Sequence, residues 1–216
     1  MKVYFISGLG ADKRVFKHIS LPDRFDTIYL DWISPLPNES LQEYARRLSK
    51  KIDINTPFAL VGLSMGGMIA AEISKLLKPK FTVLISSVPV ASQLPPYFKW
   101  MPSLNLSRLM PLRLMKSAFI MKRLFAAETA DDKATLIQMV RSIDMKFIQW
   151  AMYAIPKWKN EELPSPYIHI HGSRDKVLPM RYTKPTHVIQ KGGHLIIMNR
   201  AKEINRILEM AFLSIK

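Results

Sequence analysis

The local fold of this chain is most narrowly constrained by one five-residue stretch, Gly62-Leu63-Ser64-Met65-Gly66. Apolar residues 57–61 precede them, and residues 68–77, rich in helix formers, follow them. A glycine on each side of a serine is typical of a sharp turn from a strand into a helix, because a Cβ atom at either flank would clash where the chain touches itself. The sequence therefore predicts a strand, a tight turn at Ser64 and a helix.

The same alternation of short apolar runs and helical patterns continues along the chain. We expect strands at residues 2–6, 25–32, 57–61, 81–86, 166–171 and 186–189, and helices at residues 40–52, 68–77 and 201–215. Ser40-Leu41-Gln42-Glu43 has the pattern of a capping box, which starts a helix. Strands that alternate with helices predict a three-layer α/β/α fold with a mostly parallel sheet of about six strands.

One region interrupts the alternation. Residues 92–160 contain no glycine and no clear strand pattern, and Thr129 begins a helical stretch within them. We predict a core of residues 1–91 and 161–216, with a helical cap, or lid, of residues 92–160 over the carboxyl edge of the sheet. Seven methionines fall in this cap and either form its own core or line an adaptable apolar pocket; they are Met101, Met110, Met115, Met121, Met139, Met145 and Met152.

Composition excludes several classes of site. With no cysteine, the chain has no disulfide, thiolate metal site or cysteine nucleophile. The net charge of +15 comes from Lys and Arg spread along the chain, and no zinc-finger, basic-zipper or RNA-recognition motif is present. We therefore expect a basic solvated surface and no nucleic-acid partner, with membrane-surface contact the less favoured explanation of the charge. No run is long enough to span a bilayer, so we expect a cytoplasmic protein.

A serine at such a turn becomes a nucleophile only with a base and an acid beside it. His194 follows the last expected strand on a glycine turn, and Asp175 lies in the turn after residues 166–171. The turn after residues 81–86 offers no carboxylate, so Asp175 is the predicted acid. Because the carboxyl ends of parallel strands share one edge, we expect Ser64, His194 and Asp175 to meet there.

The remaining histidines have other expected places. His169 and His171 point to one face of a strand, where packing or loop support is expected rather than metal binding. His187 lies inside a strand, and His18 lies on the surface.

Acyl transfer also requires two backbone N–H groups that bind a developing oxyanion. The N–H group of Met65, directly after the serine and at the start of a helix, is the first predicted donor. The second should come from the loop after the first strand, Ser7-Gly8-Leu9-Gly10, where Leu9 is the first choice and Gly10 the second.

These motifs together resemble the α/β-hydrolase superfamily over nearly the whole chain. The order Ser64, Asp175, His194 is that superfamily's order, and His171-Gly172-x-x-Asp175 and Gly192-Gly193-His194 are similar to its acid and histidine motifs. The resemblance implies a hydrolase fold with a helical cap. Larger members have eight strands, whereas this chain begins at the strand before the oxyanion loop. That loop carries Ser7-Gly8 where many members have His-Gly.

We therefore expect a serine hydrolase that cleaves an ester, thioester or related acyl bond of a small, apolar substrate. Ser64, rather than the aspartate that dehalogenases of the superfamily carry, favours acyl chemistry. The expected mechanism needs neither a cofactor nor a metal, and the expected partner is the small-molecule acyl substrate. Two alternatives stay open: a non-catalytic ligand- or partner-binding protein on a hydrolase fold, and a lipase-like enzyme that acts on anionic membranes.

Overall fold

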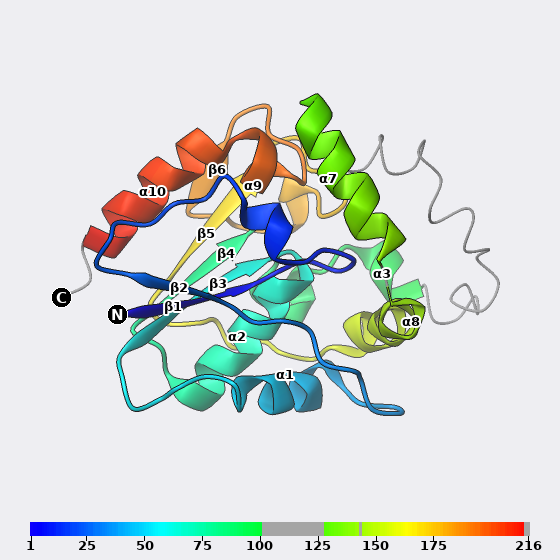
Figure 1. Cartoon of the computed structure of the whole chain (residues 1–216). Coiled ribbons are helices and arrows are strands. Elements are labelled where there is room, and N and C mark those ends of the chain that lie inside the picture. The colour runs from blue at the N-terminus through cyan, green and yellow to red at the C-terminus, as the bar shows by residue number, and fades with distance from the viewer. Residues whose placement is uncertain (101–127, 143, 214–216) are drawn as a thin grey trace.

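A sheet of six parallel strands forms the centre of the computed structural model, which describes residues 1–100, 128–142 and 144–213 (Figure 1). The strands lie side by side in the order β2-β1-β3-β4-β5-β6. Their bounds are β1 Lys2–Ile6, β2 Asp26–Tyr29, β3 Phe58–Leu63, β4 Phe81–Ile85, β5 Tyr167–Gly172 and β6 His187–Ile189. The predicted three-layer α/β/α fold is confirmed.

The central strands are apolar throughout because helices cover both of their faces. All six residues of β3 are buried, and so are all five of β4. Pairing in register sets Phe5 of β1 opposite Val61 of β3, so that both strands end at the same level. The second strand is shorter than the predicted residues 25–32: it lies at the sheet edge, pairs only with β1 and ends at Tyr29.

Helices lie on both faces of the sheet, with α1 and α2 on one side and α9 and α10 on the other (Figure 1). Their bounds are α1 Leu41–Ser49, α2 Met65–Leu77, α9 Ile196–Asn199 and α10 Ala201–Leu213. Short 3-10 turns add η1 Lys13–Phe16, η2 Ala91–Gln93, η4 Ile155–Lys157 and η5 Met180–Tyr182. The predicted capping box of α1 is present, since Ser40 N–H donates to Glu43 Oε2 (2.8 Å) and Glu43 N–H donates to Ser40 Oγ (3.2 Å).

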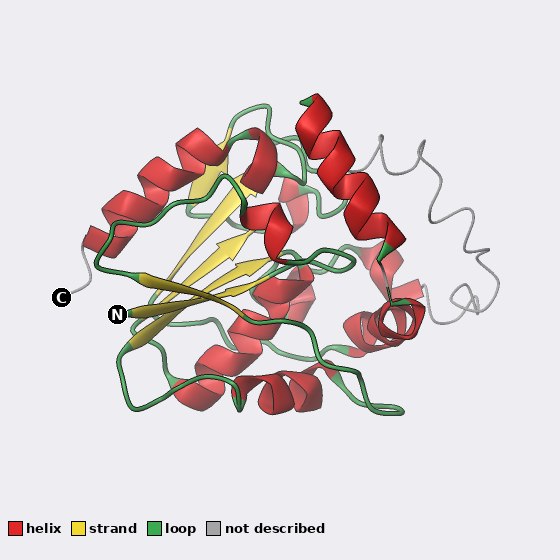
Figure 2. Ribbon diagram, in the orientation of Figure 1, coloured by secondary structure: helices red, strands yellow, loops and turns green. Residues whose placement is uncertain are grey.

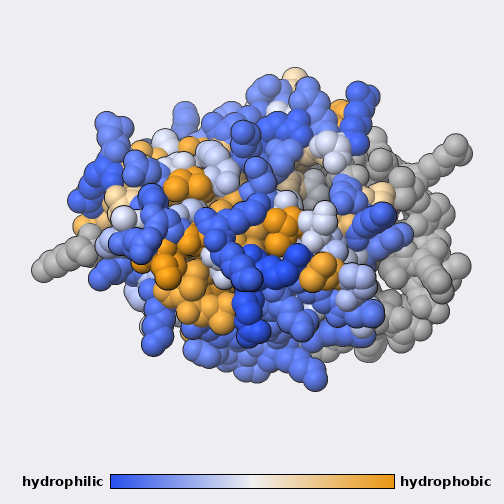
Figure 3. Space-filling model, turned by 60° about the horizontal axis from the view of Figure 1, so that its bottom comes forward, coloured by the Kyte–Doolittle hydropathy of each residue, from blue (hydrophilic) through white to orange (hydrophobic). Residues whose placement is uncertain are grey.

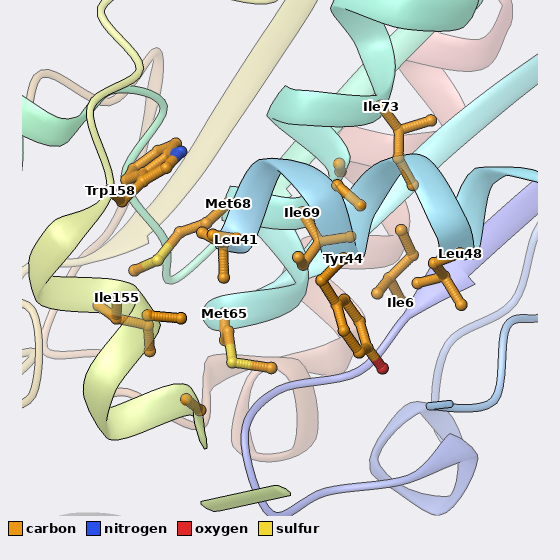
Figure 4. Close-up of a cluster of buried hydrophobic side chains, with 14 of the residues drawn as sticks. Ile6, Leu41, Tyr44, Leu48, Met65, Met68, Ile69, Ile73, Ile155 and Trp158 are labelled. Atoms are coloured by element: carbon orange, nitrogen blue, oxygen red, sulfur yellow. The ribbon is translucent and has the colours of Figure 1, made fainter. Parts of the chain in front are cut away.

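Two apolar clusters fill the space between these layers. One lies between the sheet and α1 and α2 and continues into residues 147–158, where Met68 of α2 extends toward Ile155 (Figure 4). The other lies between the sheet and the C-terminal helix, where Phe212 packs edge-on against Phe25. Each cluster buries one face of the sheet, which is the main source of stability in such a fold.

The described helices between β4 and β5 lie on the side toward which the strands point (Figure 2). They are α3 Pro96–Trp100, α7 Ala130–Arg141 and α8 Met145–Ala154. Thr129 caps α7 as predicted, accepting a hydrogen bond from the Asp132 N–H group. Residues 101–127 of the predicted cap, with Met101, Met110, Met115 and Met121, lie outside the described part of the chain.

Polar contacts join this segment to the core. The Lys17 ammonium beside η1 lies 2.6 Å from Asp131 and 2.9 Å from Asp132 of α7. Farther along, Trp158 Nε1–H donates to the buried Glu72 carboxylate of α2 at 2.5 Å. The described parts of the segment between β4 and β5 therefore contact both the loop after β1 and α2.

The outer surface is mostly hydrophilic, with apolar side chains exposed between polar ones on the face that Figure 3 shows. Exposed apolar groups include Ile54 and Met210, each more than half accessible. Among the helices that the structure describes, none has the length and apolar character needed to cross a membrane.

Candidate active site

Ser64 occupies the sharp turn between β3 and α2 in a backbone conformation that few non-glycine residues adopt, with φ 51° and ψ −120°. A Cβ atom at Gly62 would collide with the Gly66 backbone, and one at Gly66 would collide with the Ser7 carbonyl oxygen. The turn is also tied to the next strand, because Ser64 N–H donates to Ile85 O at 2.9 Å. Close backbone packing therefore explains both glycines of the motif.

Ser64, His194 and Asp175 come together in one chain of hydrogen bonds at the carboxyl ends of the strands. The distance from Ser64 Oγ to His194 Nε2 is 3.0 Å, and the distance from His194 Nδ1 to Asp175 Oδ2 is 2.8 Å. A carboxylate can only accept, so Nδ1 of His194 carries the proton of that bond, and Nε2 is the ring nitrogen within hydrogen-bond distance of the Ser64 hydroxyl. His194 is 4% exposed and Asp175 is 5% exposed, whereas Ser64 is partly accessible.

The second oxygen of Asp175 is held by its own loop. Val177 N–H and Leu178 N–H donate to Oδ1 at 2.8 and 2.9 Å. Burial alone would raise the pKa of Asp175, but the charge and hydrogen bond of His194, with the Leu178 N–H group, hold that pKa below its ordinary value. Asp175 therefore stays ionised, and its two oxygens have distinct partners.

His169 and His171 of β5 lie behind this carboxylate, each fully buried. His171 Nε2 is 2.7 Å from Leu178 O and 3.3 Å from Asp175 Oδ2, and His169 Nε2 is 3.1 Å from His171 Nδ1. Burial lowers the pKa of both rings, and that of His169 falls to about 3. Packing or loop support was expected for both rings, and His171 contacts the loop at Leu178 O; its contact with Asp175 was not predicted.

The loop after β1 faces Ser64. Ala11 N–H donates to Gly8 O at 3.0 Å, and Gly10 adopts φ 73° within the turn that this bond closes. Leu9, which is the first choice for the second oxyanion donor, lines the same cavity as Ser64. Met65 is the first residue of α2, where a backbone N–H group has no partner within the helix. Both predicted donors thus belong to segments that border the serine; their role stays a prediction.

A cavity of about 140 Å³ opens at Ser64. Apart from Ser64 and His194, its described lining is apolar or glycine: Gly8, Leu9, Ala11, Leu63, Met65, Met68, Phe98, Ile155, Val177, Leu178 and Leu195. Phe98 and Ile155 come from the segment between β4 and β5, and nothing in their sequence context marks them as site residues. A second cavity, of about 230 Å³, lies between Gly10, Ala11 and Trp32 on one side and α7 and α8 on the other. Ala11 lines both.

Two further contacts at the site were not predicted. Ser87 Oγ donates to Ser64 O at 2.7 Å, and Tyr97 Oη donates to Val177 O at 2.5 Å. Burial raises the pKa of Tyr97 to about 12, so this phenol is a stable donor. Ser87 therefore holds the backbone of the turn at Ser64, and Tyr97 holds the backbone of the loop that carries Asp175.

One group of three potential metal ligands occurs among the described residues: His18, Asp131 and Asp132. The Lys17 ammonium already lies against both carboxylates, and none of these residues lines the cavity at Ser64. His18 is exposed, as predicted, but its Nε2 atom lies 3.1 Å from Asp132. The cluster therefore forms an ion-pair contact between η1 and α7. His187, the one histidine not yet described, is the first residue of β6.

Comparison with known proteins agrees with this architecture. The sequence pattern of the alpha/beta hydrolase family matches residues 3–207. A comparison with curated protein sequences finds no match. Among solved structures, a thermophilic esterase from Thermogutta terrifontis has a TM-score of 0.76 at 18% identity, over 100% of this chain and 90% of that one. A hydrolase from Oleispira antarctica has a TM-score of 0.77 at 16% identity, over 100% and 91%.

MenH from S. aureus is similar to the same extent, with a TM-score of 0.77 at 16% identity over 99% of this chain and 93% of that one. At these identities the likeness concerns the fold. The family match, however, spans almost the whole sequence, including Ser64, Asp175 and His194. Together with the six-stranded parallel sheet and the turn at Ser64, it establishes that this chain belongs to the alpha/beta hydrolase family.

Proposed function

We propose that this protein is a serine hydrolase that cleaves an ester, thioester or related acyl bond of a small, apolar substrate. The observation that supports the proposal most directly is the hydrogen-bond chain from Asp175 through His194 to Ser64, which ends at an apolar cavity. The order of the groups is the one that the reaction requires: an ionised acid beside the imidazole, and a hydroxyl within hydrogen-bond distance of the other ring nitrogen.

The reaction begins when Ser64 Oγ attacks the substrate's carbonyl carbon while His194 Nε2 takes the hydroxyl proton. Asp175 stabilises the imidazolium that forms and holds its ring in place. The oxyanion of the tetrahedral intermediate accepts hydrogen bonds from the N–H groups of Met65 and Leu9. His194 then gives its proton to the leaving group, and an acyl group stays on Ser64. Water, activated by the same imidazole, releases the acid product.

The cavities support a substrate with a small acyl group. The cavity at Ser64 is well below the roughly 300–1,000 Å³ that drug-sized ligands occupy. Its apolar described lining offers no charged partner other than His194, which favours a hydrocarbon acyl chain or ring. The second cavity, which Ala11 separates from the first, offers space for the other half of the substrate.

A series of p-nitrophenyl esters from acetate to decanoate tests the proposal. We expect hydrolysis by the wild-type protein, fastest for short chains, and a loss of about 10⁴-fold in kcat for Ser64→Ala. Ser74→Ala is a control that removes a hydroxyl from α2, the helix that follows Ser64, outside the described lining of the cavity, while the proposed nucleophile stays. Equal rates for wild type and Ser64→Ala would refute the mechanism.

A fluorophosphonate probe separates this proposal from a non-catalytic binding protein. An activated serine forms a covalent adduct with the probe, whereas an ordinary hydroxyl does not. We expect labelling of the wild-type protein on Ser64, detected by mass spectrometry of its peptides, and no labelling of His194→Ala. A wild-type protein that stays unlabelled would favour the binding role.

A further inference from the structure

His171 has a place that the triad chemistry alone does not require. It lies in β5, four residues before Asp175. Its ring is fully buried against the loop of residues 173–179, called the acid loop because it carries Asp175. Its Nε2 atom is 2.7 Å from Leu178 O, and a carbonyl can only accept, so Nε2 must carry a proton. In a neutral ring, Nδ1 is then an acceptor, and the proton of the 3.1 Å contact belongs to His169 Nε2. One carbonyl therefore fixes the tautomers of both rings.

The same N–H group also lies close to the Asp175 carboxylate. His171 Nε2 is 3.3 Å from Asp175 Oδ2, the oxygen that accepts from His194. Oδ1 receives two backbone N–H groups, so Oδ2 is the oxygen that the loop backbone leaves to side chains. A buried carboxylate is stable only when its lone pairs face donors. His171 supplies the second positive dipole at Oδ2 and at the same time holds the Leu178 carbonyl of the loop.

The surroundings favour a neutral His171 ring. The titratable groups that face it are His169 on its own strand, Asp175 on the acid loop, and His194 after β6; Tyr97 of α3 bonds the same loop. Burial lowers the pKa of His171, and this effect outweighs the attraction of Asp175. A cation at this position would compete with His194 for Oδ2, whereas a neutral donor only orients the carboxylate.

We propose that His171 is a positioning residue for the hydrolysis proposed above: its neutral Nε2–H group anchors Leu178 O and keeps Asp175 Oδ2 directed at His194. The inference rests on the proposed function for its kinetic consequences, but its geometric content is independent of any substrate. His169 acts one step farther away, since it contacts His171 and not the carboxylate.

Two substitutions distinguish the donor from the bulk of the ring. His171→Gln puts an amide nitrogen near the position of Nε2. His171→Asn carries one near the position of Nδ1, so that Leu178 O loses its side-chain donor and Oδ2 keeps only the N–H group of His194. For His171→Asn we expect kcat to fall about 10- to 100-fold, because the Leu178 carbonyl loses its hydrogen bond and the Asp175 carboxylate loses a nearby N–H dipole, with KM within about twofold. His171→Gln should recover most of this loss.

His169→Leu is the matched control, because it changes an equally buried ring on the same face of the same strand. We expect it to lower kcat by less than about threefold, since the Nε2–H group of His171 keeps both its partners. If only packing mattered, His169→Leu and His171→Asn would be equally impaired. That result, or equal kcat for His171→Asn and His171→Gln, would overturn the proposal.

Proton NMR provides a readout that needs no substrate. The proton between His194 Nδ1 and Asp175 Oδ2 lies in a short, charge-assisted hydrogen bond and should resonate far downfield. We expect this resonance in the wild type, Ser64→Ala and His171→Gln, and its shift upfield or loss in His171→Asn. An unchanged resonance in His171→Asn refutes the positioning role. If the wild type hydrolyses no ester, this measurement still decides the inference, so the two failures are distinguishable.

Discussion

Replacing Ser64 by glycine should stabilise the fold relative to alanine at the same position, although we expect both changes to abolish the proposed hydrolysis. At φ 51° and ψ −120° the residue lies in a sparsely populated region, which costs a side-chain-bearing residue about 1–3 kcal/mol. Alanine keeps this strain because it keeps Cβ, whereas glycine relieves it. Glycine loses about 0.5–1 kcal/mol more backbone entropy on folding, so the net gain is centred near about 1 kcal/mol within a range of about 0–2.5 kcal/mol.

Thermal unfolding measures the difference directly. For a chain of 216 residues, 1 kcal/mol corresponds to about 2–4 °C in Tm, so Ser64→Gly should melt a few degrees above Ser64→Ala. Both variants lose the 3.0 Å hydrogen bond to His194, which therefore cancels in the comparison. Ala71→Gly in the middle of α2 is the control and should lower Tm, as glycine does in an ordinary helix. A Ser64→Gly protein less stable than Ser64→Ala would refute the claim of strain at the turn.

Three further outcomes follow from the packing and charge of the core. Gly66→Ala should cost at least about 3 kcal/mol in unfolding free energy, because its Cβ would overlap backbone carbonyls. Gly193→Ala is the control: its Cβ would meet nothing within 4 Å, so the unfolding free energy should change by less than about 1 kcal/mol. Trp158→Phe removes the donor to the buried Glu72 carboxylate and should cost about 1.5–3 kcal/mol in urea unfolding, and a loss below about 0.5 kcal/mol would contradict this. His169 has a pKa of about 3 when folded against 6.5 in the open chain, so between these values only the unfolded state takes up its proton. Stability should therefore fall as pH drops below about 6.5, by up to about 1.4 kcal/mol per pH unit, and His169→Leu should flatten that slope in urea titrations at a series of pH values.

Local patterns were enough to predict most of the elements. The apolar runs correctly located β1, β3 and β4, and the capping box at Ser40 and the cap at Thr129 marked the starts of α1 and α7. These features depend on nearest neighbours along the chain, which sequence records directly. The second strand was predicted too long, because its end depends on pairing with β1 and not on its own residues.

The amino-acid sequence by itself determined the turn at Ser64, the parallel α/β/α architecture and the three residue types that face one another at its edge. It did so because strand-to-helix turns, glycine flanks and the shared carboxyl edge of parallel strands are properties of short segments and their order. Only the tertiary structure decided the distances within the hydrogen-bond chain, the cavity that Phe98 and Ile155 close, and the contact of His171 with Asp175. The hydrogen-bond distances and the cavity depend on how segments far apart in the chain pack against one another. The His171 contact depends on the conformation of the loop between His171 and Asp175, and no local pattern encodes either.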